Sequence, residues 1–561
     1  MLYGPPTAKP ERGIATRQPI AFPIIAVALT VAAPAVLYFS RVPGLSELDY
    51  QIYFRLLFYN DVTNALAMLA ALVVALFVLP WRRLLEAIAA WISDRPVLFC
   101  LISFLVLAVS SRVVYQGFPL AMDEYAPLLQ ARVFASGAIT ATYPPELLDR
   151  MVVPGFQGMF ILVNHETGQA ASAYWPGLAL VMTPFALFGG EWLLNPLLGA
   201  LGLWLIGDLS RQATNHHQAR GWAMLAAVAC PQYTVNAISY YAMTGLLTLN
   251  LLYLWLLFRP GYRSAFLAGV VGSLALVMHN PVPHTLVAVP CVIWLLFQSA
   301  QRARLPALIA GYVPLSALLC LGWPLLMNAI GMQPPGVSPD DADFVSLWAA
   351  RIQSIFALPS LGVLWLRSYA AWKALIWTGP ILLLIALLLR SRSPILKLLL
   401  AAFVLTFAFY FFFPADQGHG WGYRYIHPVW GLVPVAVGIC MTSPSQPPLI
   451  RTTASAGILA SLLATPVFLF TTYSTVSLSI ALQPGNGEEQ GTVAFFNHHP
   501  SLYTIDLVRN YPDDQGRIIR MISHGPDADA KLVTTMAPGA VLEASDARGS
   551  VWRIPPGADE P

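Results

Sequence analysis

Long apolar segments recur along this chain, and their lengths constrain its fold more than any other feature. The segments are about 16 to 22 residues long, and a helix of about 20 apolar residues crosses a bilayer core roughly 30 Å thick. Charged residues make up only 11% of the chain, against about 25% in soluble globular proteins. The sequence therefore predicts an all-α polytopic membrane protein.

Thirteen transmembrane helices are predicted from these segments. They cover residues 19–41, 62–81, 96–114, 192–210, 221–238, 244–258, 264–279, 284–299, 305–327, 371–389, 395–413, 425–441 and 452–473. The first segment lacks a small-residue cleavage site and is soon followed by a second span. It is therefore not predicted to be a cleavable signal peptide.

The orientation follows from the basic residues of the short loops, which collect on the cytoplasmic side of a membrane. With the N-terminus inside, the inner segments contain 16 basic and four acidic residues, whereas the outer segments before residue 475 contain nine basic and thirteen acidic residues. An odd number of spans places the C-terminal tail outside. The short loops favour a bacterial cytoplasmic (inner) membrane.

One apolar stretch, residues 173–190, does not fit as a span. Pro176 and Pro184 interrupt it, and counting it as a span would invert the orientation of every later loop. We expect an interfacial or re-entrant helix on the outer face, which is tolerated where it packs against protein.

The chain divides into a transmembrane module, residues 1–474, and a small outer-face cap, residues 475–561. The module carries two large outer loops, 115–191 and 328–370. Three alternating pieces in the tail predict a cap of α/β or β structure. These pieces are residues 517–523, 531–535 and 550–554.

Several functional classes lack support in the sequence. A net charge of +3 is too small to indicate nucleic-acid binding. All five cysteines lie in apolar segments and none forms a C-x-x-C pair, so neither a disulfide framework nor a zinc site is predicted. No P-loop and no glycine-rich nucleotide-binding motif occurs.

Two carboxylates follow the third predicted span, in the segment 121–139. Its apolar residues have helical spacing, and Asp123 and Glu124 stand at the start of the predicted helix. A carboxylate there can take a proton from a nucleophile as a general base. The alternative is structural, with Asp123 as the N-cap and Glu124 complementing the helix dipole.

These residues carry a family resemblance. The Asp-Glu pair after a span, the Tyr-Trp-Pro-Gly at 174–177 and the Leu-Phe-Gly at 187–189 resemble the GT-C superfamily. The most similar group is glycosyltransferase family 39, which includes protein O-mannosyltransferases and the aminoarabinose transferases that modify lipid A. The resemblance covers about a third of the chain, residues 110–260 and 410–430.

By this resemblance the transmembrane module has GT-C-like architecture. The protein is expected to be a membrane glycosyltransferase, a hexosyl- or pentosyltransferase that uses a polyprenyl-phosphate sugar at the outer face of the membrane. The resemblance makes Asp123 the catalytic base and Glu124 a supporting or acceptor-orienting acid. Two departures are evident. Two extra spans precede the first large loop, and Tyr240-Tyr241 stands where the family often has a second acidic residue.

A polyprenyl-phosphate donor requires cations or hydrogen-bond donors near the outer face. The segment 416–428 offers Arg424, His419 and Tyr423 among glycines, and arginine suits bidentate phosphate contact. The segment also resembles the late donor-phosphate loop of the family. The alternative is an interfacial aromatic belt with a snorkelling arginine.

Two further segments are candidates for ligand contact. His279 and His284 lie in the tight connection 279–284, where they would contact phosphate or simply bond backbone and lipid headgroups. Asp340, Asp341 and Asp343 have the carboxylates that a divalent cation prefers, but a solvated loop explains them as well. No metal site is therefore predicted, and a requirement for a divalent cation stays open.

Two other functions remain as alternatives. One is a lipid-linked sugar flippase or transporter, although nearly all charges lie at span ends and matched broken helices are not apparent. The other is a polysaccharide polymerase or ligase that uses a diphosphate-linked donor. The sequence does not identify the sugar or the acceptor, which would be a protein, a lipid or a glycan.

Overall fold

The computed structural model describes residues 20–39, 59–77, 81–332, 356–413, 420–485, 491–498, 504–512 and 518–555. Four residues that the sequence analysis singled out lie outside these ranges. They are Asp340, Asp341, Asp343 and His419.

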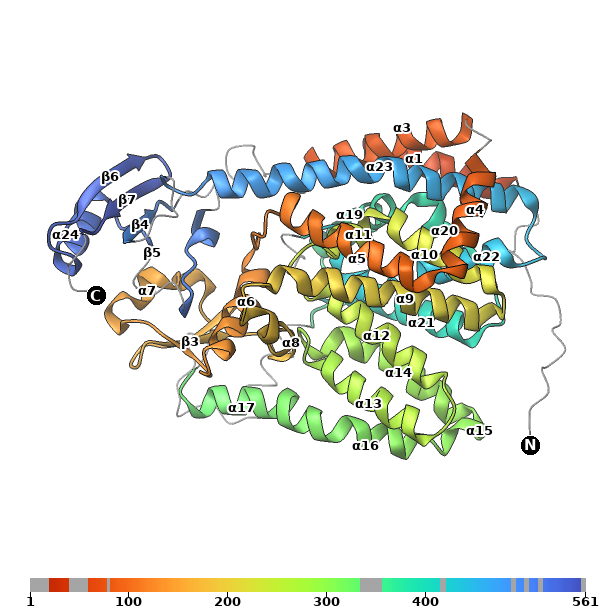
Figure 1. The fold of residues 1–561 in the computed structure, drawn as a ribbon, viewed down its shortest axis with the longest axis horizontal. Coiled ribbons are helices and arrows are strands. Elements are labelled where there is room, and N and C mark those ends of the chain that lie inside the picture. Colours follow the sequence, from red (N-terminus) through yellow and green to blue (C-terminus); the bar gives the residue numbers. More distant parts are fainter. Residues whose placement is uncertain are drawn as a thin grey trace.

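Most of the described chain forms one bundle of apolar helices (Figure 1). Among the described residues, six helical stretches are long and apolar enough to cross a membrane. They are α1 (Ala21–Phe39), α5 (Pro96–Val113), η4 with α9 (Glu191–Thr214), α16 through α17 (Leu305–Ala329), α21 with η6 (Pro394–Phe412) and α23 (Pro448–Ala481). The prediction of a polytopic helical membrane protein is confirmed.

The predicted number of thirteen spans is not confirmed. Two bent helix pairs raise the count among the described residues to eight at most: α3 (Asp61–Phe77) with α4 (Trp81–Asp94), and α19 (Leu361–Thr378) with α20 (Pro380–Leu388). Four shorter apolar helices lie where spans were predicted. They are α12 (Met243–Leu257), α13 (Tyr262–Leu276), α14 (Pro281–Phe297) and α22 (Leu432–Thr442).

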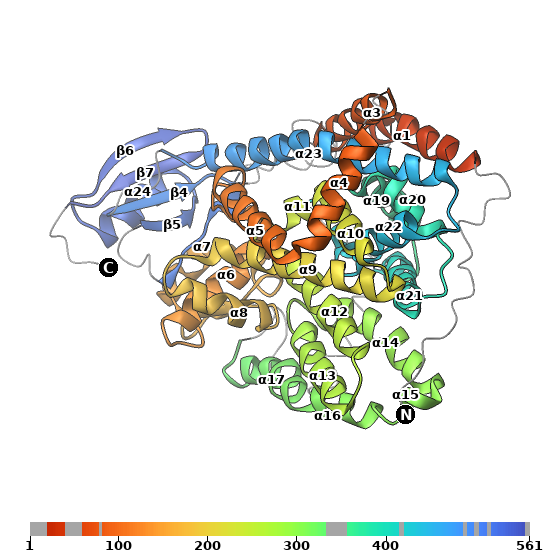
Figure 2. The ribbon, with the colours of Figure 1, turned by 45° about the vertical axis from the view of Figure 1, so that its right-hand side comes forward.

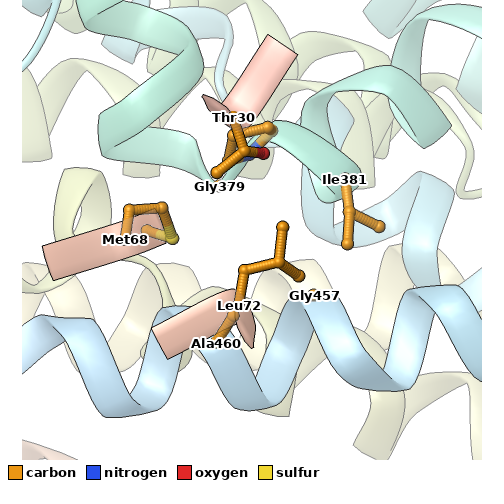
Figure 3. A pocket seen from close by; sticks show the side chains of 8 residues that line it. Thr30, Met68, Leu72, Gly379, Ile381, Gly457 and Ala460 are labelled. Atoms are coloured by element: carbon orange, nitrogen blue, oxygen red, sulfur yellow. The ribbon is translucent and has the colours of Figure 1, made fainter. Parts of the chain in front are cut away.

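The predicted span 371–389 is wrong as one continuous helix. It bends by 106° where α19 ends and α20 begins. Gly379 adopts a φ of +87°, which favours glycine, and Pro380 has no N–H to continue the hydrogen-bond ladder. A small apolar pocket lies beside this break, between α1, α3, α20 and α23 (Figure 3). It is lined by Thr30, Met68, Leu72, Gly379, Pro380, Ile381, Gly457 and Ala460.

The first large loop contains the predicted surface helix, α6 (Met122–Ala135), and the short apolar helix α8 (Gly177–Ala186). Between them lies a three-stranded sheet that the sequence analysis did not predict. Its order is β1-β3-β2, all antiparallel, with β1 (Ala141–Thr142), β2 (Ile161–Asn164) and β3 (Gln169–Ser172). Short helices flank the strands: η2 (Pro145–Leu147), α7 (Leu148–Met151) and η3 (Pro154–Phe156).

The C-terminal cap has mixed α/β structure, as predicted. Its sheet has the order β5-β4-β7-β6, with β4 and β5 parallel. The elements are β4 (Thr492–Phe496), η8 (Thr504–Leu507), β5 (Ile518–Ile522), α24 (Pro526–Met536), β6 (Val541–Asp546) and β7 (Gly549–Arg553). The predicted strand 531–535 is wrong, because these residues lie in α24, whose first turn contains Asp527 and Asp529.

The cap and the first large loop share one hydrophobic core. This core joins residues of α6 and β2, such as Leu129 and Ile161, to Phe495 of β4 and Met521 of β5. Figure 2 shows the cap sheet beyond one end of α23, beside the segment that carries α6 and α7. The carboxylate pair of α6 therefore lies where the helical bundle, the first loop and the cap meet.

The remaining elements complete the bundle. They are α10 (His217–Ala229), α11 (Pro231–Asn236), α15 (Ser299–Arg302), η5 (Ser316–Leu321) and η7 (Arg424–Val429).

Candidate active site

The start of α6 presents Asp123 to the bundle. The N-cap residue is Ala121, which makes no side-chain capping bond, and Asp123 is the second residue of the helix. The alternative that Asp123 is the N-cap is therefore wrong. The Asp123 side chain is 14% exposed, so it is largely but not completely removed from solvent.

Two groups from distant parts of the chain bind the Asp123 carboxylate. The Nη1 of Arg424 lies 2.7 Å from Oδ2 of Asp123, and the Arg424 side chain is 8% exposed. The hydroxyl of Tyr174 donates a hydrogen bond to Oδ1. Tyr174 is the first residue of the Tyr-Trp-Pro-Gly motif, so the motif and the carboxylate pair meet at one place.

His279 joins this group through Tyr174. The rings of Tyr174 and His279 lie 4.5 Å apart, centroid to centroid, at 30°. The N–H of Gly177 donates a hydrogen bond to the carbonyl of Val277 at 2.8 Å, and a Cβ on Gly177 would collide with this carbonyl. Glycine thus lets α8 approach the end of α13 closely enough to bring His279 against Tyr174.

A glycine-rich turn places Arg424 at the start of η7. Gly422 has a φ of +62°, and a Cβ there would collide with the carboxamide of Gln232, so the turn requires glycine. The Arg424 guanidinium lies over the rings of Tyr241 and Tyr425, at 5.1 and 6.0 Å from their centroids. Aromatic faces attract such a cation, and they hold it beside Asp123.

The remaining sequence-predicted residues are placed differently. Tyr423 is fully buried and packs near Tyr425, with 5.8 Å between ring centroids. His284 is fully buried inside the bundle, and its ring nitrogens lie 2.7 Å from Oδ1 of Asn250 and 2.6 Å from the Tyr312 hydroxyl. Contact of Tyr423 with a phosphate stays a prediction.

Glu124 has partners different from those of Asp123, and they stabilise the start of α6. Its fully buried carboxylate accepts hydrogen bonds from the Tyr115 hydroxyl and the Tyr240 N–H, both at 2.8 Å, and from the Leu120 N–H. These contacts join the start of α6 to the segment that follows α5 and to the connection between α11 and α12. A direct contact between Glu124 and an acceptor stays a prediction.

The two neighbouring carboxyls differ in acidity because their surroundings differ. Burial alone would raise the pKa of Asp123, but Arg424, His279 and the Tyr174 hydroxyl lower it, and the net pKa is below that of an ordinary aspartate. Burial raises the pKa of Glu124 to about 7, despite the hydrogen bonds that it accepts. Asp123 is thus ionised at neutral pH, whereas Glu124 is near the midpoint of its titration.

The cap contributes residues to the same place, which the sequence analysis missed. Arg509 is 4% exposed and donates hydrogen bonds to the carbonyls of Pro119 and Leu120, just before α6. The carbonyl of Asn510 accepts a hydrogen bond from the Tyr125 hydroxyl at 2.7 Å. No motif marks these residues, and only the packing of the cap on the first loop shows their role.

The described residues contain no group of three or more His, Cys, Asp or Glu side chains arranged to hold a metal ion. The site is instead an ion pair of Asp123 and Arg424, bounded by Tyr174, His279 and Tyr241. It combines a carboxylate that can accept a proton with a guanidinium that can bind an oxyanion.

The fold of this chain, a helical bundle with a large first loop and a C-terminal cap, is similar to that of a solved structure. The particular likeness is to ArnT from Cupriavidus metallidurans bound to undecaprenyl phosphate, with a TM-score of 0.50, 13% sequence identity and coverage of 81% of this chain and 97% of that one. The apo state of that protein has a TM-score of 0.48 at the same identity, covering 82% and 97%. No family model and no curated protein matches the sequence.

Proposed function

We propose that the protein is a membrane glycosyltransferase that transfers a sugar from a polyprenyl-phosphate carrier to an acceptor at the outer face of the bacterial inner membrane. The observation that carries the proposal is the Asp123–Arg424 ion pair, at the meeting point of loop, bundle and cap. The fold shared with ArnT, whose structure contains undecaprenyl phosphate, supports the choice of carrier.

The proposed chemistry is a single displacement with inversion at the anomeric carbon. An acceptor hydroxyl or amine gives its proton to Asp123 as its oxygen or nitrogen bonds to that carbon. The bond from the anomeric carbon to the phosphate oxygen breaks, and polyprenyl phosphate leaves with the bonding electrons. Arg424, with His279 nearby, stabilises the charge that develops on the phosphate.

Donor binding precedes proton transfer in this reaction. Arg424 binds Asp123 in the structure, and a phosphate is a stronger bidentate partner for a guanidinium. Binding of the sugar donor therefore draws Arg424 away and leaves Asp123 available to the acceptor. Glu124 is assigned to hold the start of α6, because its bonds run to Tyr115, Leu120 and Tyr240.

The test is sugar transfer by the purified protein in detergent. Radiolabelled polyprenyl-phosphate sugars are offered with a crude envelope extract, and polyprenyl-diphosphate sugars are offered in parallel. Label should pass from the monophosphate carrier to an acceptor. Transfer only from the diphosphate carrier would favour a polymerase or ligase. Movement of labelled lipid across liposomes without transfer would favour a flippase.

A further inference from the structure

A second polar centre lies at the end of α9 remote from Asp123. The start of α9 follows Trp192, whose ring lies under the Arg112 guanidinium near the end of α5, on the Asp123 side. Asp208 comes 14 residues after Leu194, the first residue of α9, and is therefore about 21 Å along the helix. This centre is thus separate from the candidate active site.

Three arginines converge on the buried Asp208 carboxylate. Nη2 of Arg220 and Nη2 of Arg211 lie 2.6 and 2.9 Å from Oδ1. Nη2 of Arg259 lies 3.4 Å from Oδ2, which also accepts a hydrogen bond from Nε1 of Trp255 at 2.8 Å. Three guanidinium groups face one carboxylate, so the cluster carries two uncompensated positive charges.

This excess charge is presented at an accessible position. The side chains of Arg211 and Arg259 are 44% and 43% exposed. Within the described part of the chain, the Nε–H groups of Arg220 and Arg259 are buried and have no acceptor. The Asp208 contacts therefore do not use up the donors of the cluster.

The surroundings of the cluster suit a membrane interface. The Arg259 guanidinium lies over the Trp255 ring at 4.3 Å, and Trp255 packs near Trp204 with 5.6 Å between centroids. Tryptophans of this kind mark the headgroup level of a bilayer. Arg304 donates hydrogen bonds to the carbonyls of Leu257 and Arg259, which fixes the backbone that carries Arg259.

We propose that the Asp208 cluster binds the phosphate of an anionic phospholipid headgroup, in the leaflet opposite the candidate active site. Guanidinium groups match phosphate oxygens bidentately, and basic sites between membrane helices bind anionic headgroups. The phosphate supplies the acceptors and the negative charge that Asp208 alone does not provide. A free phosphate ion offers the same chemistry, so the experiment separates the two sources.

The test compares two double variants of the full chain in detergent. R211Q/R259Q removes the excess charge and leaves the Asp208–Arg220 pair, which keeps α9 and α10 joined. R390Q/R392Q removes two exposed arginines from another loop and is the control for charge alone. Binding of phosphatidylglycerol is measured by native mass spectrometry and by the shift in melting temperature, with phosphatidylcholine and inorganic phosphate as competing probes.

The wild type and the R390Q/R392Q control should bind phosphatidylglycerol alike. R211Q/R259Q should bind it roughly 30-fold more weakly, because each arginine near a headgroup contributes about a fivefold gain in binding. Equal binding by all three proteins, or an equal loss in both variants, would overturn the proposal. Equal stabilisation by millimolar inorganic phosphate would overturn the assignment to a lipid. If R211Q/R259Q does not fold, R211Q alone decides by the same comparison.

Discussion

At the scale of single residues, Asp123 and Arg424 each neutralise the other. Removing one partner of a largely buried ion pair costs about 3–5 kcal/mol, because the other charge is left uncompensated. A donor phosphate offers Arg424 a replacement anion, so the pair can separate when the donor is bound. We therefore expect Asp123 to become a free base only in the donor complex.

This coupling predicts a pH dependence of transfer. Because the pKa of Asp123 in the free protein lies below that of an ordinary aspartate, the acidic limb of kcat/KM should lie at correspondingly low pH. In the donor complex Asp123 has lost Arg424 to the phosphate, so its pKa rises. The acidic limb of kcat should therefore lie at higher pH than that of kcat/KM.

Arg424→Gln is the matched variant for this profile. Its free protein lacks the cation that lowers the pKa of Asp123, so the acidic limb of kcat/KM should move to higher pH than in the wild type. Rates measured across the acid range with saturating and limiting donor give both limbs. Coincident wild-type limbs, unchanged in the variant, would refute the coupling.

The raised pKa of Glu124 predicts how folding stability depends on pH. Its pKa in the folded protein is about 7, above its ordinary value of 4.5, so the unfolded chain releases this proton first. Folding stability should consequently fall as the pH rises from about 4.5 to about 7. Glu124→Gln should lack this part of the slope and be destabilised by about 1–3 kcal/mol, because it leaves buried N–H groups poorly paired.

The measurement for Glu124 is the melting temperature of wild type and Glu124→Gln across this pH range. The difference between the two proteins isolates Glu124 from the other titrating groups. A difference that does not vary with pH would show that the carboxyl does not titrate differently on folding.

At the scale of elements, the cap segment after η8 holds the start of α6. Arg509→Met removes the hydrogen bonds to the carbonyls of Pro119 and Leu120, so the direction of Asp123 should be less well fixed. We expect kcat to fall about 10- to 100-fold, as misplacement of a catalytic group by 1 Å does. The KM for the donor should change little, because Arg424 is untouched.

The control for Arg509 is Arg553→Met, which removes an exposed ion pair with Glu543 elsewhere on the cap. It should leave kcat unchanged. Millimolar guanidinium should restore part of the activity of Arg509→Met and none of any loss caused by misfolding. Wild-type kcat in a folded Arg509→Met protein would rule out a positioning role.

The sequence predicts an element well where the local spacing of apolar residues determines it. Local spacing sufficed for α6 and for β5 and β7. It failed at 531–535, where acidic residues at the start of α24 favour a helix over the alternating pattern. The small sheet of the first loop was missed because its strands are only two to four residues long.

In the candidate site, too, local motifs indicate individual residues but do not show which of them meet. The sequence indicated Asp123, His279 and Arg424 separately. Tyr174 belongs to one of the motifs that carry the family resemblance. Their meeting depends on tertiary contacts such as the bond from Gly177 to Val277, which no local pattern encodes. Arg509 was missed for the same reason, since it lies 390 residues from Pro119 in the chain.

At the scale of the whole molecule, the first loop and the cap should behave as one cooperative unit, because they share a core. Phe495→Ala should destabilise this unit by about 3–5 kcal/mol, the usual cost of deleting a buried aromatic ring. Hydrogen exchange should then accelerate in the first-loop sheet, residues 141–172, as well as in the cap.

Val541→Ala is the control for Phe495→Ala, because Val541 lies on the same sheet but is 65% exposed. It should leave exchange in both regions unchanged. Faster exchange confined to the cap in Phe495→Ala would show that the loop is stable without it.

Asp123→Asn tests whether Asp123 is the general base, by comparison with the wild type in two measurements on the same preparations. These are equilibrium binding of polyprenyl phosphate and single-turnover sugar transfer. Loss of the general base should lower transfer by about 10²–10⁴-fold. Binding should become about tenfold tighter or more, since an ionic hydrogen bond to Arg424 no longer competes with the phosphate. Unchanged transfer would exclude Asp123 as the base, and binding lost in parallel with transfer would show that Asp123 does not compete with the phosphate for Arg424.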